Sequence, residues 1–183
     1  MQMPWYAYLI VVLGITFWFA PFVSAHHQTG PASTVDRRSR WGVLLQLLSY
    51  SLLWQGHFWV RPLPLWRICF SISLFAVAAL LSWTSSHALA GQLRVDAALG
   101  SDHHLVRSGP YRFVRNPIYT SMLCILCATA VIVASWQLFL ISLLIFMIGT
   151  EIRVRTEEKL LAARFAEEFQ EYKRSVGAYI PFV

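Results

Sequence analysis

One uncharged stretch of 33 residues, from Ile118 to Thr150, constrains this chain more than any other feature of its sequence. As one straight helix it would be ~50 Å long at ~1.5 Å per residue, whereas the hydrocarbon core of a bilayer is ~30 Å thick. A single strongly tilted helix is one way to accommodate it. A helical hairpin that turns near Ser135 and Trp136 is favoured, and it returns the chain to the same side of the membrane.

Three further stretches without charge precede this run. They are the residues before Asp36, those between Arg40 and Arg61, and those between Arg67 and Arg94. The chain is 57% hydrophobic and only 13% charged, whereas soluble domains have ~25% charged residues. We therefore predict an all-α integral membrane bundle of about five transmembrane helices with a cytoplasmic C-terminal helix. The expected spans are residues 4–24, 41–60, 65–87, 117–134 and 136–150.

Basic residues divide unequally between the two sides of such a bundle. Of the 15 Lys and Arg residues, Arg61 and Arg67 lie on one side and the other 13 on the opposite side. The positive-inside rule then puts the N-terminus outside and the loops 25–40, 88–116 and 151–183 in the cytoplasm, with a bacterial inner membrane as the expected location. The 13 residues are Arg37, Arg38, Arg40, Arg94, Arg107, Arg112, Arg115, Arg153, Arg155, Lys159, Arg164, Lys173 and Arg174.

Two local patterns have a simpler structural interpretation. The sequence Val23-Ser24-Ala25 resembles a signal-peptide cleavage site, but no basic residue precedes its long apolar run, so a first membrane helix is favoured. Cys124-x-x-Cys127 resembles a redox or metal motif, yet on a membrane helix it indicates packing of small side chains. The net charge of +6 indicates attraction to a bilayer surface, and no nucleic-acid motif is present. We expect the lipid bilayer as a partner, no nucleic acid and no metal site.

Two polar segments flank the uncharged run. Before it, Asn116 is a favoured N-cap residue and Pro117 suits the first helical position, so this helix start would suit an anionic group. The same pattern also fits a plain membrane-helix start. After the run, Arg153 and Glu157 are four residues apart, as in many surface salt bridges. A hairpin would bring both beside Asn116 and Tyr119, which predicts a site at the bilayer surface.

Three stretches then carry a resemblance. They are His103-x-Leu-Val-x-Ser-Gly-Pro-Tyr111, Arg115-Asn-Pro-x-Tyr119 and Arg153-x-x-x-Glu157-Glu158-x-x-Leu161. Together they resemble the isoprenylcysteine carboxyl methyltransferase family and its phospholipid N-methyltransferase relatives, over about residues 94–183. Two departures from the family pattern are Asn116 in place of a His and Ala166 in place of a Gly.

The resemblance implies a membrane enzyme that uses S-adenosylmethionine. It implies one structural domain, with membrane helices in residues 1–93 and a cofactor-binding region in residues 94–183. It assigns Arg153 to orientation of the methyl acceptor. The residues that it assigns to the cofactor are Asp96, His103, His104, Leu105, Val106, Tyr111, Asn116, Pro117, Ile118, Tyr119 and Glu157.

Several functions remain open at this point. The favoured one is O-methylation of a carboxylate on a lipid-like acceptor or an isoprenylated cysteine, because Arg153 beside Glu157 suits a carboxylate and a cationic cofactor. The alternatives are phospholipid N-methylation, a non-catalytic membrane protein that keeps the fold, and a membrane reductase that uses a nicotinamide cofactor. The reductase is the weakest of these, because no dinucleotide-binding fingerprint is present. The oligomeric state is left open by the sequence.

Overall fold

The computed structural model describes residues 4–24, 34–35, 38–56, 63–89, 98–99 and 105–179. Apart from two short strands, β1 and β2, these residues form helices and their connections. This architecture confirms the all-α prediction. The elements are α1 (Trp5–Ser24), β1 (Thr34–Val35), α2 (Ser39–Leu53), α3 (Leu65–Leu89), β2 (Ala98–Leu99), the 3-10 helix η2 (Gly109–Arg112), α4 (Pro117–Val133) and α5 (Trp136–Ser175).

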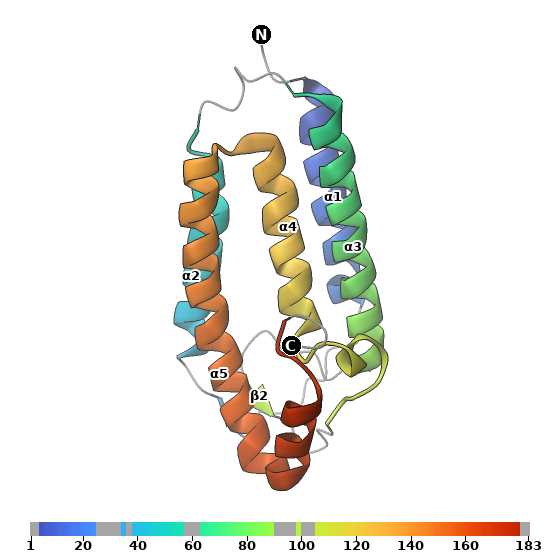
Figure 1. Cartoon of the computed structure of the whole chain (residues 1–183), viewed down its shortest axis with the longest axis vertical. Coiled ribbons are helices and arrows are strands. Elements are labelled where there is room, and N and C mark those ends of the chain that lie inside the picture. Colours follow the sequence, from blue (N-terminus) through green and yellow to red (C-terminus); the bar gives the residue numbers. More distant parts are fainter. Residues whose placement is uncertain are drawn as a thin grey trace.

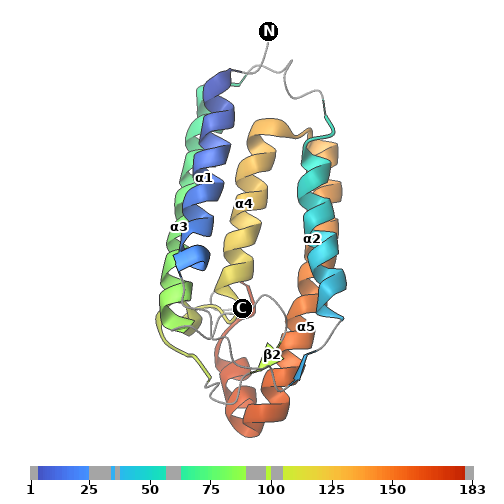
Figure 2. The ribbon, with the colours of Figure 1, turned by 180° about the vertical axis from the view of Figure 1, so that it is seen from behind.

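The five long helices form an elongated bundle in which α4 lies between two helix pairs. In Figure 1, α2 and α5 stand on one side of α4, and α1 and α3 stand on the other. The view from behind in Figure 2 shows the same arrangement. α5 packs along α2 and α4 packs along α3, whereas α4 and α5 contact each other little although they are consecutive. The strands β1 and β2 pair antiparallel and join the first loop to the third.

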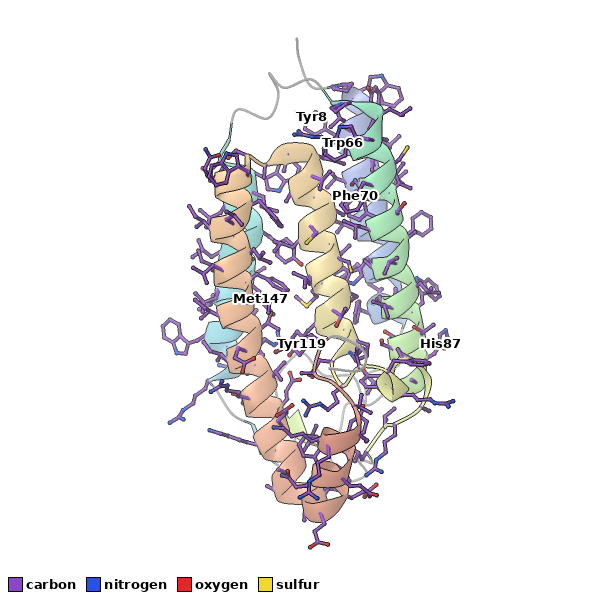
Figure 3. All side chains as sticks on the ribbon, in the orientation of Figure 1. Tyr8, Trp66, Phe70, His87, Tyr119 and Met147 are labelled. Carbon is purple, nitrogen blue, oxygen red and sulfur yellow. The ribbon has the colours of Figure 1, made fainter. Side chains whose placement is uncertain are left out.

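The chain is an integral membrane protein by the length and composition of its helices. Three helices are long and apolar enough to cross a bilayer: α1, α3 and α5. α4 is apolar but has only 17 residues, and α2 has 15. Many of the large apolar side chains point outward, as Trp66 and Phe70 do in Figure 3, with exposed fractions of 62% and 51%. Such a surface fits lipid rather than water.

The predicted hairpin is confirmed at the predicted place. α4 ends at Val133, α5 begins at Trp136, and the Oγ of Ser135 accepts a hydrogen bond from the backbone N–H of Leu138 at 3.3 Å. Ser135 therefore caps the second helix of the hairpin.

The predicted span 41–60 differs from α2, which ends at Leu53 and is followed by a turn over residues 54–56. The prediction relied on the absence of charged residues, which does not reveal where a helix ends. Gly56, which lies in the turn, disfavours a helix although it carries no charge. Residues 57–60 lie outside the described residues.

Polar side chains tie the helices together within the bundle. The Ser71 hydroxyl of α3 donates to the carbonyl of Ala128 in α4 at 2.9 Å. Across the other side of α4, the Tyr50 hydroxyl of α2 donates to the carbonyl of Met122 at 2.7 Å. Hydrogen bonds between helices matter in lipid because apolar burial against lipid tails supplies little driving force for helix association.

α5 continues well past its apolar stretch and then changes direction. Its first charged residue is Glu151, and the helix extends to Ser175, as the sequence predicted for the tail. At Ala166 the backbone leaves the helical region, with φ at +42° and ψ at −115°. A residue with a Cβ rarely adopts this conformation, whereas glycine adopts it without steric cost. The position at which the family has a glycine is thus the position at which this helix turns back.

Replacing Ala166 with glycine should stabilise the protein. The variant Ala166→Gly relieves the strain of the positive φ, and we expect the free energy of unfolding to rise by about 1 kcal/mol. Thermal unfolding of purified protein in detergent measures the change. The matched control is Ala163→Gly, at an exposed helical position one turn earlier, which should instead lower the free energy of unfolding by about 0.5–1 kcal/mol. Equal destabilisation by both glycines would contradict the role given to Ala166.

Candidate functional site

Charged side chains gather at one end of the bundle, where α4 begins and α5 leaves its apolar stretch. Figure 3 shows the nitrogen and oxygen tips concentrated there, with Tyr119 at the edge of that region. Along the rest of the bundle the outward side chains are almost all carbon. Hydrogen bonds of Tyr119 with Arg153 and Glu157 confirm the predicted convergence of the segments that flank the uncharged run.

Tyr119 links the two charged residues of α5. The Nε of Arg153 donates to the Tyr119 hydroxyl at 2.8 Å, and that hydroxyl donates to the Oε1 of Glu157. The guanidinium of Arg153 also lies 5.3 Å from the centre of the Tyr119 ring, and its Nη2 lies 3.7 Å from the Oε1 of Glu157. Tyr119 is only 6% exposed. These contacts fix the guanidinium between an aromatic face and a carboxylate.

The carboxylate of Glu157 can accept a further hydrogen bond from a ligand. The side chain of Arg153 is 11% exposed and that of Glu157 is 32% exposed. Within the described part of the chain, both polar contacts of Glu157 are made by Oε1. Its Oε2 therefore has lone pairs for a hydrogen-bond donor, such as an amine or a hydroxyl group.

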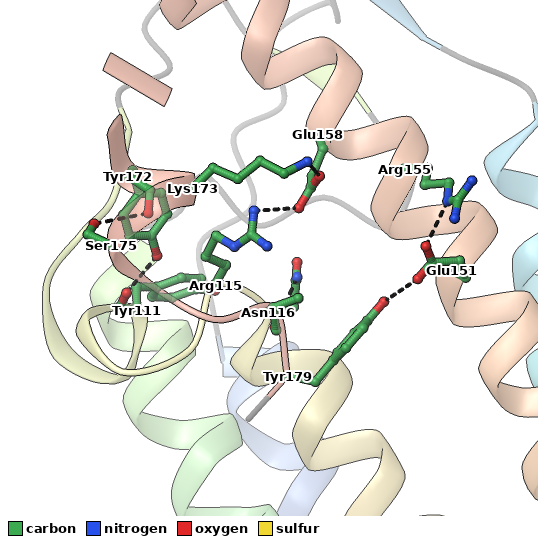
Figure 4. Close-up of polar contacts among 11 residues, drawn as sticks. Tyr111, Arg115, Asn116, Glu151, Arg155, Glu158, Tyr172, Lys173, Ser175 and Tyr179 are labelled. Carbon is green, nitrogen blue, oxygen red and sulfur yellow. Dashed lines mark hydrogen bonds and ion pairs between the residues drawn. The ribbon is translucent and has the colours of Figure 1, made fainter. Parts of the chain in front are cut away.

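The segment after α5, residues 176–179, folds back against the start of α4, as Figure 4 shows. Val114 pairs with Gly177 in a short parallel bridge, and the backbone N–H of Arg115 donates to the carbonyl of Gly177 at 2.9 Å. Both the backbone N–H and the side-chain Nδ2 of Asn116 donate to the carbonyl of Ala178, at 3.2 and 3.1 Å.

These contacts correct one prediction about Asn116. It precedes Pro117 at the start of α4 as expected, but its side chain makes no capping hydrogen bond to the helix. The side-chain amide of Asn116 donates instead to the carbonyl of Ala178. This acceptor arrives from residues far along the chain, so the local Asn-Pro pattern did not reveal it.

A second set of contacts holds the returning segment in place, also drawn in Figure 4. Glu158 accepts from Nη1 of Arg115 at 2.9 Å through one oxygen and from Nζ of Lys173 at 2.6 Å through the other. The hydroxyl of Tyr172 donates to the carbonyl of Tyr111 at 2.6 Å. The side chain of Glu158 is 16% exposed, so this carboxylate is largely shielded and joins three parts of the chain.

Two tyrosines of this region stay protonated at neutral pH. Burial raises the pKa of Tyr111, and the negative charge of Glu157 and the ionisable hydroxyl of Tyr172 act in the same direction. Burial also raises the pKa of Tyr179, whose hydroxyl donates to Glu151 at 3.0 Å. Both side chains therefore present hydroxyl donors rather than phenolate charges.

The structure describes some of the residues that the sequence assigns to the cofactor and not others. Asp96, His103 and His104 lie outside the described residues. Leu105 and Val106 are half-buried in the irregular segment before η2, Tyr111 lies in η2, and Pro117, Ile118 and Tyr119 form the first turn of α4. The structure brings Tyr119 and Glu157 into contact and directs Asn116 toward the chain end.

Buried polar atoms at this end of the bundle add donors and acceptors that sequence reasoning missed. The hydroxyls of Ser85 and Ser86 in α3, with the Nε atoms of Arg107 and Arg115, are buried and lack a hydrogen-bond partner among the described residues. η2 packs against α3 beside these serines, since a Cβ added to Gly109 would lie 3.4 Å from the Cβ of Ala88 and 4.0 Å from the carbonyl oxygen of Thr84. A ligand with an amine, a carboxylate and sugar hydroxyls suits this donor and acceptor set. A cluster of Thr84, Ser85 and Ser86 at the end of an apolar stretch was the available sequence signal.

Comparison with known proteins identifies relatives over much of the chain. Residues 66–168, more than half of the chain, match the family described as phospholipid methyltransferase. The cobalt-zinc-cadmium resistance protein CzcN of Cupriavidus metallidurans is 29% identical over 170 residues, which cover 87% of this chain and 73% of CzcN.

Relatives from several organisms carry the name protein-S-isoprenylcysteine O-methyltransferase. The protein from Saccharomyces cerevisiae is 34% identical over 83 residues, 45% of this chain and 35% of its own length. The protein from Tribolium castaneum is 31% identical over 100 residues, 49% of this chain and 32% of its own length. The chain thus spans about a third of the length of these two O-methyltransferases.

Removing the charge of Glu158 should loosen the returning segment. In Glu158→Gln, Arg115 and Lys173 lose a shared carboxylate in a shielded position, and we expect the free energy of unfolding to fall by about 1–3 kcal/mol. Thermal unfolding in detergent measures the loss, and limited proteolysis reports whether the segment after Ala166 becomes accessible. The control is Glu168→Gln, whose ion pair with Arg107 is 3.4 Å long with the Glu168 side chain 56% exposed. That change should cost under about 1 kcal/mol, and equal losses in both variants would refute the special role of Glu158.

Proposed function

The chain belongs to the phospholipid methyltransferase family, and from this premise we propose that it transfers a methyl group from S-adenosylmethionine to a carboxylate. The acceptor is a lipid-like molecule or an isoprenylated cysteine that reaches the site from the bilayer. The observation that carries the proposal is the guanidinium of Arg153, held by Tyr119 and Glu157 just beyond the apolar part of α5. There it can meet the polar end of a molecule whose apolar part remains in lipid.

A fixed guanidinium suits a carboxylate acceptor. Arginine presents several N–H donors in one plane and binds carboxylates through paired hydrogen bonds. Its Nε is used by the Tyr119 hydroxyl at 2.8 Å, which fixes the plane of the guanidinium. A carboxylate is already ionised at neutral pH and needs no general base. The chain therefore has to orient it and exclude water rather than move a proton.

The cofactor, when bound, supplies an electrophilic methyl group attached to a positively charged sulfur. We assign Glu157 to its amine or ribose hydroxyls, because the Oε2 of Glu157 has hydrogen-bonding capacity and a carboxylate forms strong hydrogen bonds with such donors. We also retain the other sequence-based assignments as part of the proposal. These residues are Asp96, His103, His104, Leu105, Val106, Tyr111, Asn116, Pro117, Ile118 and Tyr119.

Phospholipid N-methylation is the second candidate, because the matching family is described as phospholipid methyltransferase, but the relatives named as O-methyltransferases support the carboxylate acceptor. A protonated amine carries no lone pair for attack, so that reaction needs a proton acceptor near the substrate. Arg153 would repel the ammonium form at the proposed acceptor position. A non-catalytic role has less support, because the contacts among Tyr119, Arg153 and Glu157 keep the charged site assembled.

We also propose an orientation in the membrane and a division of the chain. The N-terminus lies outside and the C-terminus in the cytoplasm of a bacterial inner membrane, with all five long helices as spans. The pairing of β1 with β2 supports a common side for the first and third loops. Residues 1–93 supply membrane helices and residues 94–183 the cofactor-binding region, both within one domain.

Removing the carboxylate of Glu157 should weaken cofactor binding. We expect Glu157→Ala to lose about 1.5–3 kcal/mol of binding free energy for S-adenosylmethionine, the typical contribution of a hydrogen bond to a charged group. Isothermal titration calorimetry with the purified protein measures the affinity. Glu171→Gln, at an exposed position of α5, is the control and should bind normally. An unchanged affinity in Glu157→Ala would remove Glu157 from the cofactor site.

Changing Arg153 to lysine distinguishes the two enzyme hypotheses. Arg153→Lys keeps the charge but loses the planar set of donors. For a carboxylate acceptor, kcat/KM should fall about 10²-fold, while the affinity for S-adenosylmethionine stays within about twofold because Glu157 remains. Arg155→Lys, whose side chain is 73% exposed, is the control and should retain activity. The acceptor is first identified by incubating membranes with labelled cofactor, and normal turnover in Arg153→Lys would favour the amine acceptor.

A reporter fused after Val183 tests the orientation. The 13-to-2 division of basic residues predicts that the C-terminus faces the cytoplasm. In a bacterial host, a fluorescent protein fused there should fold and fluoresce, and alkaline phosphatase at the same place should stay inactive. Active phosphatase with a dark fluorescent fusion would reverse the proposed orientation.

A further inference from the structure

α2 and α5 approach each other closely at a pair of glycines, Gly42 and Gly149. A Cβ added to Gly42 would lie 2.6 Å from the carbonyl oxygen of Gly149, and one added to Gly149 would lie 2.8 Å from the carbonyl oxygen of Gly42. Real Cβ atoms do not approach backbone atoms this closely, and backbone atoms cannot rotate away as a side chain can. The absence of side chains at both positions therefore sets the distance between these two helices.

The stem of Arg153 lies in the same contact. The Cβ added to Gly42 would also lie 2.5 Å from the Cγ and 3.3 Å from the Cδ of Arg153. Arg153 begins one helical turn after Gly149, its methylene groups cross the backbone of α2 at Gly42, and its Nε reaches the Tyr119 hydroxyl in α4. α2 thus supplies the surface on which this side chain rests between α5 and α4.

A buried hydrogen bond fixes the same contact one turn along α2. The Nε2 of Gln46 donates to the Oγ1 of Thr150 at 2.9 Å, and the two residues are 2% and 1% exposed. The bond therefore fastens α2 against α5 beside Arg153.

We propose that Gly42, supported by the Gln46–Thr150 hydrogen bond, is a positioning residue for methyl transfer. It acts through Arg153: its missing side chain gives the arginine stem a path to Tyr119, and so sets where the guanidinium holds the acceptor. This inference rests on the proposed function, because Arg153 is given the role of acceptor anchor there. Gly42 itself touches neither acceptor nor cofactor in this proposal.

Kinetics of Gly42→Ala provide the first test. We expect the KM for the acceptor to rise and kcat/KM to fall about 10- to 100-fold, with the affinity for S-adenosylmethionine within about twofold. The matched control is Gly14→Ala, because a Cβ there would lie 2.4 Å from the ring of Phe75, at the contact between α1 and α3. It disturbs another close helix contact, here against a side chain, and should leave the KM for the acceptor unchanged. Equal effects of the two variants would overturn the proposal.

A double mutant shows whether Gly42 acts through Arg153. In the Arg153→Lys background, Gly42→Ala should cause little further loss of kcat/KM, because the anchor is already impaired. If the fold-loss of kcat/KM in the double mutant equals the product of the two single-mutant losses, the proposal is overturned. If Gly42→Ala does not fold, Thr150→Val replaces it, since this change removes the bond to Gln46 without adding volume. We expect a smaller rise in KM from Thr150→Val, and an unchanged KM would overturn the proposal.

A measurement without turnover separates this inference from the proposed function. In protein labelled with ¹⁵N-arginine, the Nε–H resonance of Arg153 is identified by its loss in Arg153→Lys. Gly42→Ala should shift this resonance and Gly14→Ala should not, whereas an unmoved resonance in Gly42→Ala would overturn the positioning role. If the wild-type protein methylates no carboxylate, the proposed function fails, and the resonance alone then decides whether Gly42 positions Arg153.

Discussion

The hydroxyl of Tyr119 joins the two halves of the bundle at the end where the charged residues lie. It accepts from Arg153 and donates to Glu157, so one buried oxygen links α4 to α5. The two helices contact each other little along their length, because α4 packs on α3 and α5 packs on α2. The capped turn at Ser135 fixes one end of this hairpin, and the Tyr119 contacts fix the other. In low dielectric surroundings such a shared hydroxyl strengthens both of its hydrogen bonds.

The turn at Ala166 brings the last part of α5 back to the start of α4. Without a change of direction, α5 would continue away from the bundle as a straight helix, and its last residues would not reach α4. The positive φ at Ala166 turns the chain back, so Lys173 reaches Glu158 and the backbone of Gly177 and Ala178 pairs with the segment before α4. A strained residue can persist because these contacts over-determine its conformation.

Sequence reasoning succeeded where spacing alone decides the outcome. The length of the uncharged run and the thickness of a bilayer placed the hairpin turn at Ser135, and the four-residue spacing placed Arg153 beside Glu157. It failed where a segment distant in sequence supplies a hydrogen-bond partner that replaces the local one. The side-chain amide of Asn116, predicted to cap α4, donates instead to the carbonyl of Ala178. The contact of Gly42 with the stem of Arg153 was also out of reach, because no pattern within α2 specifies which helix it will meet.

Electrostatics connects this architecture to the choice of acceptor. The Arg153 side chain is 11% exposed, so its charge is weakly screened and acts strongly on a neighbouring group. A carboxylate acceptor beside it would lose some hydration but gain paired hydrogen bonds from a guanidinium whose plane Tyr119 already fixes. A cationic amine would lose hydration and meet the like charge of Arg153. The same three contacts that close the bundle therefore also bias the site toward an anionic acceptor.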